Sequence, residues 1–365
     1  MMRCFRKPSK GRNTKVDEEE VKSSSTRKEF RFAEGRSEEE SFMIKNGGLI
    51  LEGLISSCGI NFTPYRTFSK RQLQIATNNY ARNRVVHSGL CHSYKGNLDD
   101  REVIVKNWFK IQCSITEVVV GLQMNNHKNA LKLLGCCLET PIPSLVFDYA
   151  ENGCLSDHIY EGVNRPLLSW ESRLWIAIDV ADGISYLHTG TSRPIIHRNI
   201  KPCNIFLDKD FRAKLTEFGD SLSIPLGETY VETIVVRTYG YADPVYVETG
   251  KCTEKSDVHG FAMVLFEILS GKRLSNCLRQ DKEQLDEGNN KDLSFEDQIW
   301  RYFKGNILRE GNSEQRMACA ELARRCMVYN PEERPTMVEV AYELRRIQKG
   351  ILHPASTSLS HHLQA

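Results

Sequence analysis

The sequence predicts an α+β protein of two lobes, a small lobe of antiparallel strands with one helix and a larger, mainly helical lobe. Residues 102–106 form a short β-branched run typical of a strand, and residues 115–124 have the apolar spacing of a helix. From about residue 148 onward, helical patterns dominate. A chain of 365 residues is long enough to give such lobes substantial cores.

The N-terminal region precedes both lobes. Charged residues and serines dominate residues 1–41, which cannot bury enough apolar surface to fold, so we expect a disordered tail. Residues 42–67 are expected to form a leader helix and a linker. This helix should begin near Asn46 and end at Gly59, with one apolar face made of Leu51, Leu54, Ile55 and Cys58.

The two lobes are expected to occupy residues 68–349, divided into 68–147 and 148–349, with a C-terminal tail at 350–365. Ser169 is a suitable cap for a helix that runs through His188. Thr336 and Glu339 have the spacing of a capping box, which predicts a last helix ending near residue 349.

Composition excludes several classes of protein. A net charge of +2 does not favour binding to nucleic acid, and no run approaches the roughly 20 apolar residues of a membrane span. The N-terminus carries no apolar secretory core. The twelve cysteines include no C-x-x-C pair, which indicates reduced, mostly buried thiols in a cytosolic protein.

The most informative stretch is H-R-N-I-K-P-C-N at residues 197–204. It resembles the catalytic loop of protein kinases, H-R-D-x-K-x-x-N, whose Asp accepts the proton of the substrate hydroxyl. Asn199 stands at that position, and losing a positioned general base typically costs about 10²–10⁴ in rate. Lys201 matches the lysine of the motif. The chain therefore resembles a protein kinase whose catalytic base has been replaced.

Two positions resemble the phosphate-binding pair of the family. Lys106 matches the strand lysine that contacts the α- and β-phosphates of ATP, and Glu117 matches the helix glutamate that holds it. Only eleven positions separate them, fewer than in the kinases that this chain resembles. The helix should therefore start late, which argues against a Lys106–Glu117 ion pair. The alternative for Lys106 is an ordinary solvated lysine.

The loop that covers the phosphates in the family, G-x-G-x-x-G-x-V, is degraded in this chain. An ungapped match places Val86, Ser88 and Cys91 where the three glycines belong. Glycines allow backbone amides to approach the phosphates closely, often at φ angles that other residues resist. We expect a hairpin that forms but binds phosphate poorly.

The positions that would contact adenine are also altered. Val105 replaces a usual Ala, Ser93 a usual Val, and Phe206 a usual Leu. Asp148, at the boundary of the lobes, completes the candidate cofactor-binding residues. Extra volume in a fitted pocket typically costs about 1–3 kcal/mol, so we expect ATP to bind weakly or not at all.

The metal-binding motif is changed in one of two ligands. The stretch T-E-F-G at residues 216–219 resembles D-F-G, with Glu217 in place of the magnesium-binding Asp. Asn204 matches the second ligand; the alternative is a loop asparagine that bonds to backbone. Magnesium demands near-ideal octahedral geometry, so we expect the longer arm of Glu217 to impair its binding.

The activation segment resembles that of the family at residues 240–245. Val245 replaces the Glu that normally pairs with a buried Arg, here Arg334, which is thus expected to lack its partner. Asp257 matches the Asp that braces the catalytic loop. Arg198 could bind a phosphate on Thr229 or Thr233, or make a structural hydrogen bond to nearby backbone.

Longer stretches narrow the resemblance. The patterns F-S-x-x-Q-L-x-x-A-T-N-N-Y at 68–80 and L-L-G-C-C-L-E at 133–139 resemble plant receptor-like kinases of the wall-associated type. Because no ectodomain or membrane span precedes these patterns in the sequence, we expect a receptor-like cytoplasmic kinase. The leader N-G-G-x-x-L-E-x-L-I-x-x-C at 46–58, with Asn199 and the degraded loop, is similar to the plant pseudokinases related to the HopZ-effector immune adaptor.

This resemblance implies a catalytically inactive adaptor of plant immunity. It implies a coiled-coil NLR receptor as one partner and bacterial effectors, or kinases modified by effectors, as the other. The location would be cytoplasmic, or peripheral at the plasma membrane through the receptor complex. The alternatives are a slow Ser/Thr receptor-like cytoplasmic kinase and a switch that binds ATP without transferring phosphate.

Overall fold

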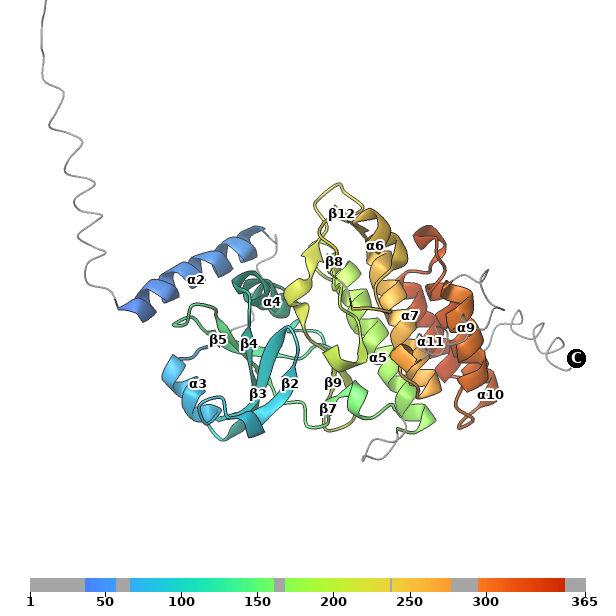
Figure 1. Cartoon of the computed structure of the whole chain (residues 1–365), viewed down its shortest axis with the longest axis horizontal. Coiled ribbons are helices and arrows are strands. Elements are labelled where there is room, and N and C mark those ends of the chain that lie inside the picture. The colour runs from blue at the N-terminus through green and yellow to red at the C-terminus, as the bar shows by residue number, and fades with distance from the viewer. Residues whose placement is uncertain (1–36, 57–65, 161–167, 237, 277–294, 352–365) are drawn as a thin grey trace, which may run out of the picture.

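The computed structural model describes residues 37–56, 66–160, 168–236, 238–276 and 295–351. It shows the two expected lobes, with the sheet and α2–α4 in one and the long helices of the C-terminal half in the other (Figure 1). Of the predicted disordered tail, residues 1–36 lie outside the described residues, as do Cys58 and Gly59 at the predicted end of the leader helix. The prediction is wrong for residues 38–41, which belong to a helix.

A six-stranded sheet in the order β1-β5-β6-β4-β3-β2 forms the small lobe. All its neighbouring strands are antiparallel except β1, which pairs parallel with β5 and falls within the predicted linker. The strands are β1 (Arg66–Thr67), β2 (Val85–Ser88), β3 (Cys91–Leu98), β4 (Arg101–Trp108), β5 (Leu133–Cys137) and β6 (Ser144–Asp148).

Helices cover both faces of this sheet. α4 (Ile111–Met124) packs with Ile104, Leu133 and Leu145 on one face, and α3 (Lys70–Ala76) places Leu73 on the other with Val105 and Val146. Ser69 begins α3 with a capping box. The centre of the sheet is thus buried on both sides, which explains why residues 103–105 of β4 and 145–147 of β6 are apolar at successive positions.

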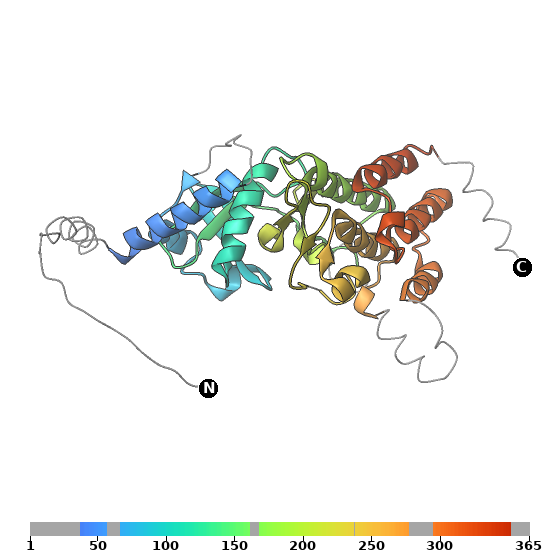
Figure 2. The same ribbon diagram turned by 90° about the horizontal axis from the view of Figure 1, so that it is seen from above.

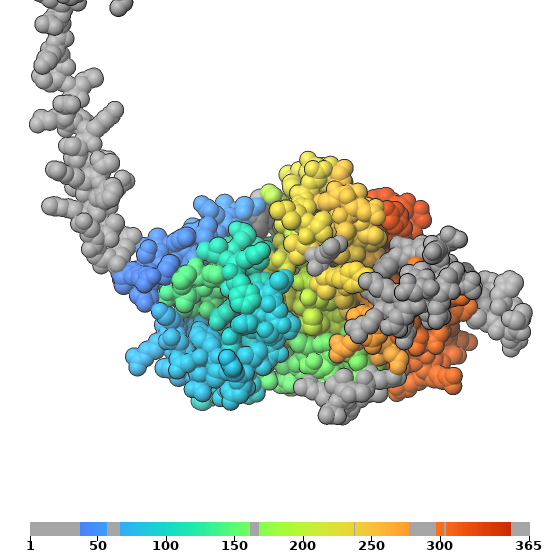
Figure 3. Space-filling view, in the orientation of Figure 1, coloured from blue at the N-terminus to red at the C-terminus, as the bar shows by residue number. Residues whose placement is uncertain are grey.

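The leader helix α2 (Glu38–Ser56) begins eight residues before the expected start at Asn46 and includes the acidic run 38–40. The predicted apolar face divides: Leu54 packs against the core of the small lobe, whereas Leu51 and Ile55 are 54 % and 61 % exposed. Asn46 and Ile50 are the buried residues instead. α2 lies along α4 (Figure 2) and forms a ridge on the surface of the small lobe (Figure 3).

The large lobe is mainly helical, as predicted, and its core centres on α5 and α7. Its helices are α5 (Trp170–Thr189), α6 (Pro244–Thr249), α7 (Glu254–Ser270), α9 (Phe295–Asn306), α10 (Ser313–Cys326) and α11 (Met337–Gln348). Ser169 caps α5, and Thr336 and Glu339 form the capping box of α11, which confirms both predicted caps.

Short strand pairs lie between the lobes and along the activation segment. They position the loops of the candidate site, since Asn204 directly precedes β9 and Thr216 directly follows its antiparallel partner β10. The strands are β7 (Gly153–Cys154), β8 (Ile195–Ile196), β9 (Ile205–Leu207), β10 (Ala213–Leu215), β11 (Leu222–Ser223), β12 (Val231–Glu232) and β13 (Lys251–Cys252).

Candidate functional site

A buried cluster of three charged residues, Lys106, Glu117 and Glu217, joins the two lobes; we call it the lysine–glutamate cluster. Lys106 Nζ lies 2.7 Å from Glu117 Oε1 and 2.8 Å from Glu217 Oε1. The Lys106–Glu117 pair, against which the short spacing argued, is formed, because α4 begins at Ile111, four residues before the predicted start, and presents Glu117 to β4. The alternative of a solvated lysine is also wrong, since Lys106 is 0 % exposed.

Two further residues complete this cluster and were missed in the sequence. Trp108 donates from Nε1 to Glu117 Oε2 at 2.6 Å, and Thr216 Oγ1 accepts from Lys106 Nζ at 3.0 Å. A Cβ on Gly219 would lie 2.4 Å from the Trp108 ring, so that glycine is needed for contact with the indole. The sequence could have predicted the place of Trp108, because residues two apart on a strand share a face and Trp108 follows Lys106 at that spacing.

The charges within the lysine–glutamate cluster are unequal. Burial disfavours the charged ammonium, but the two carboxylates outweigh burial and raise the pKa of Lys106. Burial raises the pKa of Glu117 to about 7 against the attraction of Lys106. For Glu217 the attraction of Lys106 exceeds the effect of burial, so its pKa is lowered. The lysine therefore pairs with Glu217 as a full carboxylate, whereas Glu117 is the carboxyl that takes up a proton first.

The β2–β3 hairpin forms as predicted and covers this cluster with side chains where the family has glycines. The Cys91 thiol lies 3.3 and 3.4 Å from the two carboxylate oxygens of Glu217 and is fully buried. The His87 ring packs edge-on against Phe206, with ring centroids 6.4 Å apart. The underside of the hairpin is therefore occupied by protein atoms.

The candidate adenine contacts divide into two groups. Val105, Ser93 and Phe206 are buried at 0 %, 0 % and 2 % exposure in the packed small lobe. Asp148 is not part of this group, because it is the last residue of β6, is opposite Val103 of β4 and pairs with the exposed Arg101 at the end of these strands. Asp148 instead lines a groove on the outside of the lobes, together with Arg101 and Lys132.

The catalytic loop is braced as in an intact kinase fold. Asp257 accepts from the backbone N–H groups of His197 at 2.7 Å and Arg198 at 2.9 Å, as its motif predicted. Asn199 Oδ1 accepts from Thr238 Oγ1, whose oxygen in turn accepts from Lys201 Nζ, each at 3.2 Å. Asn199 and Lys201 thus lie together, but the amide has no proton-accepting power of the kind a carboxylate supplies.

The two candidate metal ligands do not form a site that fits magnesium. Asn204 donates from Nδ2 to Asn199 O at 2.9 Å, the structural role considered as its alternative, which leaves its Oδ1 as the atom that would face a metal. The Glu217 carboxylate already faces the Lys106 ammonium, a cation that would repel a divalent ion. Among the described residues, no group of three or more His, Cys, Asp or Glu side chains is arranged to hold a metal ion.

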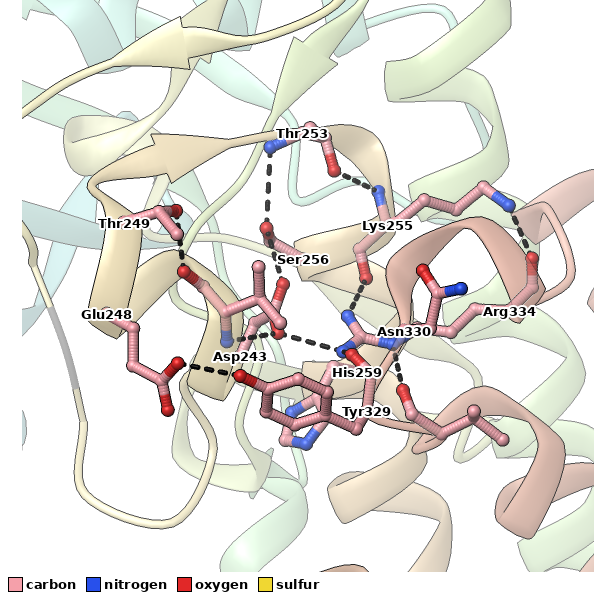
Figure 4. A network of polar contacts seen from close by, with 12 residues as sticks. Asp243, Glu248, Thr249, Thr253, Lys255, Ser256, His259, Tyr329, Asn330 and Arg334 are labelled. Carbon is pink, nitrogen blue, oxygen red and sulfur yellow. Dashed lines mark hydrogen bonds and ion pairs between the residues drawn. The ribbon is translucent and has the colours of Figure 1, made fainter.

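The activation segment is anchored by an unexpected residue. Arg334 does not lack a partner, because its Nη2 lies 2.9 Å from Asp243 Oδ1 and both side chains are buried (Figure 4). Asp243, two residues before Val245, thus supplies the carboxylate. Arg198 donates to the backbone oxygens of Asp220 and Ile234, the structural alternative for this arginine.

Residues 81–344 match the family of protein tyrosine and serine/threonine kinases, so the chain belongs to the protein kinase family. Wall-associated receptor kinase-like 4 of Arabidopsis thaliana is 38 % identical over 316 residues, which cover 85 % of this chain and 41 % of that protein. Non-functional pseudokinase ZED1 of the same plant is 38 % identical over 326 residues, covering 84 % of this chain and 96 % of ZED1.

The chain thus spans less than half the length of its receptor-kinase relatives; with Wall-associated receptor kinase 1 of Arabidopsis thaliana, 37 % identical, it covers 43 % of the protein. It spans nearly all of ZED1. Within the part of the chain that the structure describes, no helix is both long and apolar enough to cross a bilayer.

Proposed function

We propose that this kinase-family protein is an adaptor with impaired phosphoryl transfer, a pseudokinase. The observation that carries the proposal is the state of Lys106, whose ammonium is enclosed by two carboxylates and a hydroxyl of the chain itself. Asn199 adds an independent defect, because its amide replaces the carboxylate that accepts the proton of the substrate hydroxyl during phosphoryl transfer.

The adaptor role is proposed in plant immune signalling. This proposal is supported by the similarity of the chain to nearly the whole length of ZED1 and by the leader pattern at residues 46–58. We propose a coiled-coil NLR receptor as one partner and a bacterial effector or effector-modified kinase as the other, in the cytoplasm or at the inner face of the plasma membrane. Co-purification with candidate receptors tests this role, and a chain that binds none of them refutes it.

A weakly active serine/threonine kinase is the second candidate. It is favoured by the formed Lys106–Glu117 pair, which an active kinase requires, and by the brace from Asp257, which keeps the catalytic loop formed. In this case ATP and Mg²⁺ would have to displace Glu217 from Lys106.

Transfer of the γ-phosphate from ATP decides between these candidates. The purified protein and its Lys106→Met variant are incubated with Mg²⁺ or Mn²⁺ and a generic Ser/Thr substrate. We expect equal background in both proteins. Phosphate incorporation by the wild type that disappears in Lys106→Met would establish a kinase and overturn the proposal.

A further inference from the structure

The Lys106 ammonium is surrounded by oxygen atoms of the chain itself, two of which accept hydrogen bonds from it. An ammonium carries three N–H donors. Three acceptors surround Nζ, namely Glu117 Oε1 at 2.7 Å, Glu217 Oε1 at 2.8 Å and Thr216 Oγ1 at 3.0 Å. With the side chain fully buried, a ligand oxygen could approach Nζ only by displacing one of these three oxygens.

Glu217 is the member of this set that bridges the lobes. It precedes the short helix η4 (Phe218–Asp220) and has a left-handed backbone at φ 67°, which is uncommon for a residue with a side chain. Its carboxylate therefore enters the small lobe from the segment after β10 and meets Lys106 on β4. The extra methylene relative to Asp gives the carboxylate the reach to contact both Lys106 and Cys91.

Cys91 closes the cluster on the side of the hairpin. Its thiol contacts both oxygens of Glu217, and its fully buried position in β3 shields the ion pair from water. An ion pair that is screened from water is stronger than an exposed one, provided that its remaining lone pairs are satisfied. A glycine at this position would leave the carboxylate open on that side.

We propose that Glu217 is a built-in ligand of Lys106. Through this ion pair Glu217 keeps α4 beside β4, and residues 216–220 beside Lys106, without any nucleotide. The proposal extends the proposed function, since an adaptor that uses no ATP still needs its lobes fixed. Trp108 links α4 to residues 216–220, because it donates a hydrogen bond to Glu117 and packs on Gly219. The position of α2 depends on that of α4, because Gly53 packs on Val119 of α4. The surface that α2 forms on the small lobe therefore has the same shape with or without nucleotide.

Hydrogen–deuterium exchange of α4 tests this inference directly. In the wild type, we expect protection of residues 111–124 to be complete without ligand and unchanged by Mg-ATP at millimolar concentration. In Glu217→Gln, which keeps the size of the side chain but removes its charge, exchange of α4 should be faster by about tenfold or more. Glu310→Gln, the same change at an exposed position, is the matched control and should leave exchange as in the wild type.

Two results would overturn the inference. One is equal exchange of α4 in Glu217→Gln and the wild type; the other is a clear gain of protection when Mg-ATP is added to the wild type. Cys91→Gly, which restores the family glycine and leaves all charges in place, provides a second route if Glu217→Gln fails to fold. Its α4 should also exchange faster, by at least about threefold, and unchanged exchange would count against the built-in ligand.

The exchange experiment and the phosphate-transfer assay report on different statements. Phosphate transfer by the wild type would refute the pseudokinase assignment even if α4 is protected without nucleotide. The converse case is that the wild type transfers no phosphate while Glu217→Gln leaves the exchange of α4 unchanged. That pair of results would support the pseudokinase assignment and refute the inference that Glu217 is a built-in ligand.

Discussion

At the residue scale, the lysine–glutamate cluster places one ammonium between two buried carboxylates. Burying an uncompensated charge is costly, so a cluster with one cation and two anions favours taking up one proton. Burial raises the pKa of Glu117 from its ordinary value of 4.5 to about 7, which makes it the group that takes this proton. Glu217, whose pKa is lowered, keeps its charge beside Lys106.

The Glu117 pKa predicts a pH dependence of stability with a definite sign. Between pH 4.5 and about 7 the folded protein holds a proton on Glu117 that the unfolded chain releases. The contribution of Glu117 to the free energy of unfolding is therefore fully present below pH 4.5, falls as pH rises to about 7 and is constant above it. The total change should be on the order of 1–3 kcal/mol.

Denaturant unfolding of the wild type and Glu117→Gln from about pH 5 to 8 measures this effect. The difference in unfolding free energy between the two proteins should shift in favour of the variant as pH rises, because Gln has no proton to lose. Parallel curves for the two proteins would contradict the prediction. The contribution of Glu217 has the opposite sign, being lost as pH falls below its ordinary range, and does not overlap this window.

Sequence motifs located the charged residues of the site but not their mutual contacts. Lys106, Glu117, Glu217 and Asn199 could each be found because motif spacing identifies positions along a chain. The ion pair could not, because it depends on where α4 begins, and Lys110 caps that helix without a side-chain hydrogen bond. Helix starts without a recognisable cap are weak signals in sequence.

At the scale of elements, α2 docks through a polar residue. Asn46 is fully buried and donates from Nδ2 to the carbonyl oxygens of Leu138 at 3.0 Å and Thr140 at 2.9 Å. Apolar spacing alone predicted the face that includes Leu51, because the rule assigns Asn to solvent. The buried face of α2 is instead a mixture of Asn46, Ile50 and the close approach at Gly53.

Asn46→Ala should release α2 from the small lobe. The substitution removes two buried hydrogen bonds, whose loss costs about 1–3 kcal/mol each when acceptors are left unsatisfied. Exchange of the amides of residues 38–56 should therefore increase, while the rest of the domain stays protected. Leu51→Ala, on the exposed face of the same helix, is the control; equal effects of both variants would show that the buried face is assigned wrongly.

The anchor of the activation segment is a second feature at this scale. The Arg334 guanidinium donates four hydrogen bonds, to Asp243 Oδ1, Val328 O, Lys255 O and Tyr329 O (Figure 4). The family motif suggested a missing carboxylate at Val245, since a motif specifies positions and not the side chain that arrives there in space. Asp243 compensates, and it also accepts from Ser256 Oγ at 3.0 Å.

Asp243→Ala should lower the free energy of unfolding by about 3–5 kcal/mol, because it leaves a buried guanidinium without its countercharge. Adding Val245→Glu to this variant should recover part of the loss by restoring the carboxylate of the family, whereas Val245→Glu alone should gain little. Denaturant titration of the three variants beside Asp210→Ala, at an exposed position, measures these effects. A loss below about 1 kcal/mol in Asp243→Ala, typical of an exposed pair, would contradict the assignment.

At the scale of the whole molecule, the altered positions are distributed over both lobes. Cys91 belongs to the hairpin of the small lobe, Glu217 to the segment that bridges the lobes and Asn199 to the catalytic loop of the large lobe. The scaffold between them is retained, with the Asp257 brace, the Arg334 anchor and a formed Lys106–Glu117 pair. The bilobal fold was therefore predictable from sequence, because it depends on periodicity and caps that these substitutions leave untouched.

This distribution predicts that no single reversion restores phosphate transfer. Asn199→Asp supplies a base next to Thr238 but leaves Lys106 enclosed by Glu217, so its transfer rate should equal that of Lys106→Met. Adding Glu217→Asp shortens the side chain that occupies Lys106, and adding Cys91→Gly opens the hairpin above it. We expect transfer from γ-labelled ATP first in the triple variant, at least about tenfold above background. Robust transfer by Asn199→Asp alone would mean that Mg-ATP displaces Glu217 readily, and that the missing base is the whole defect.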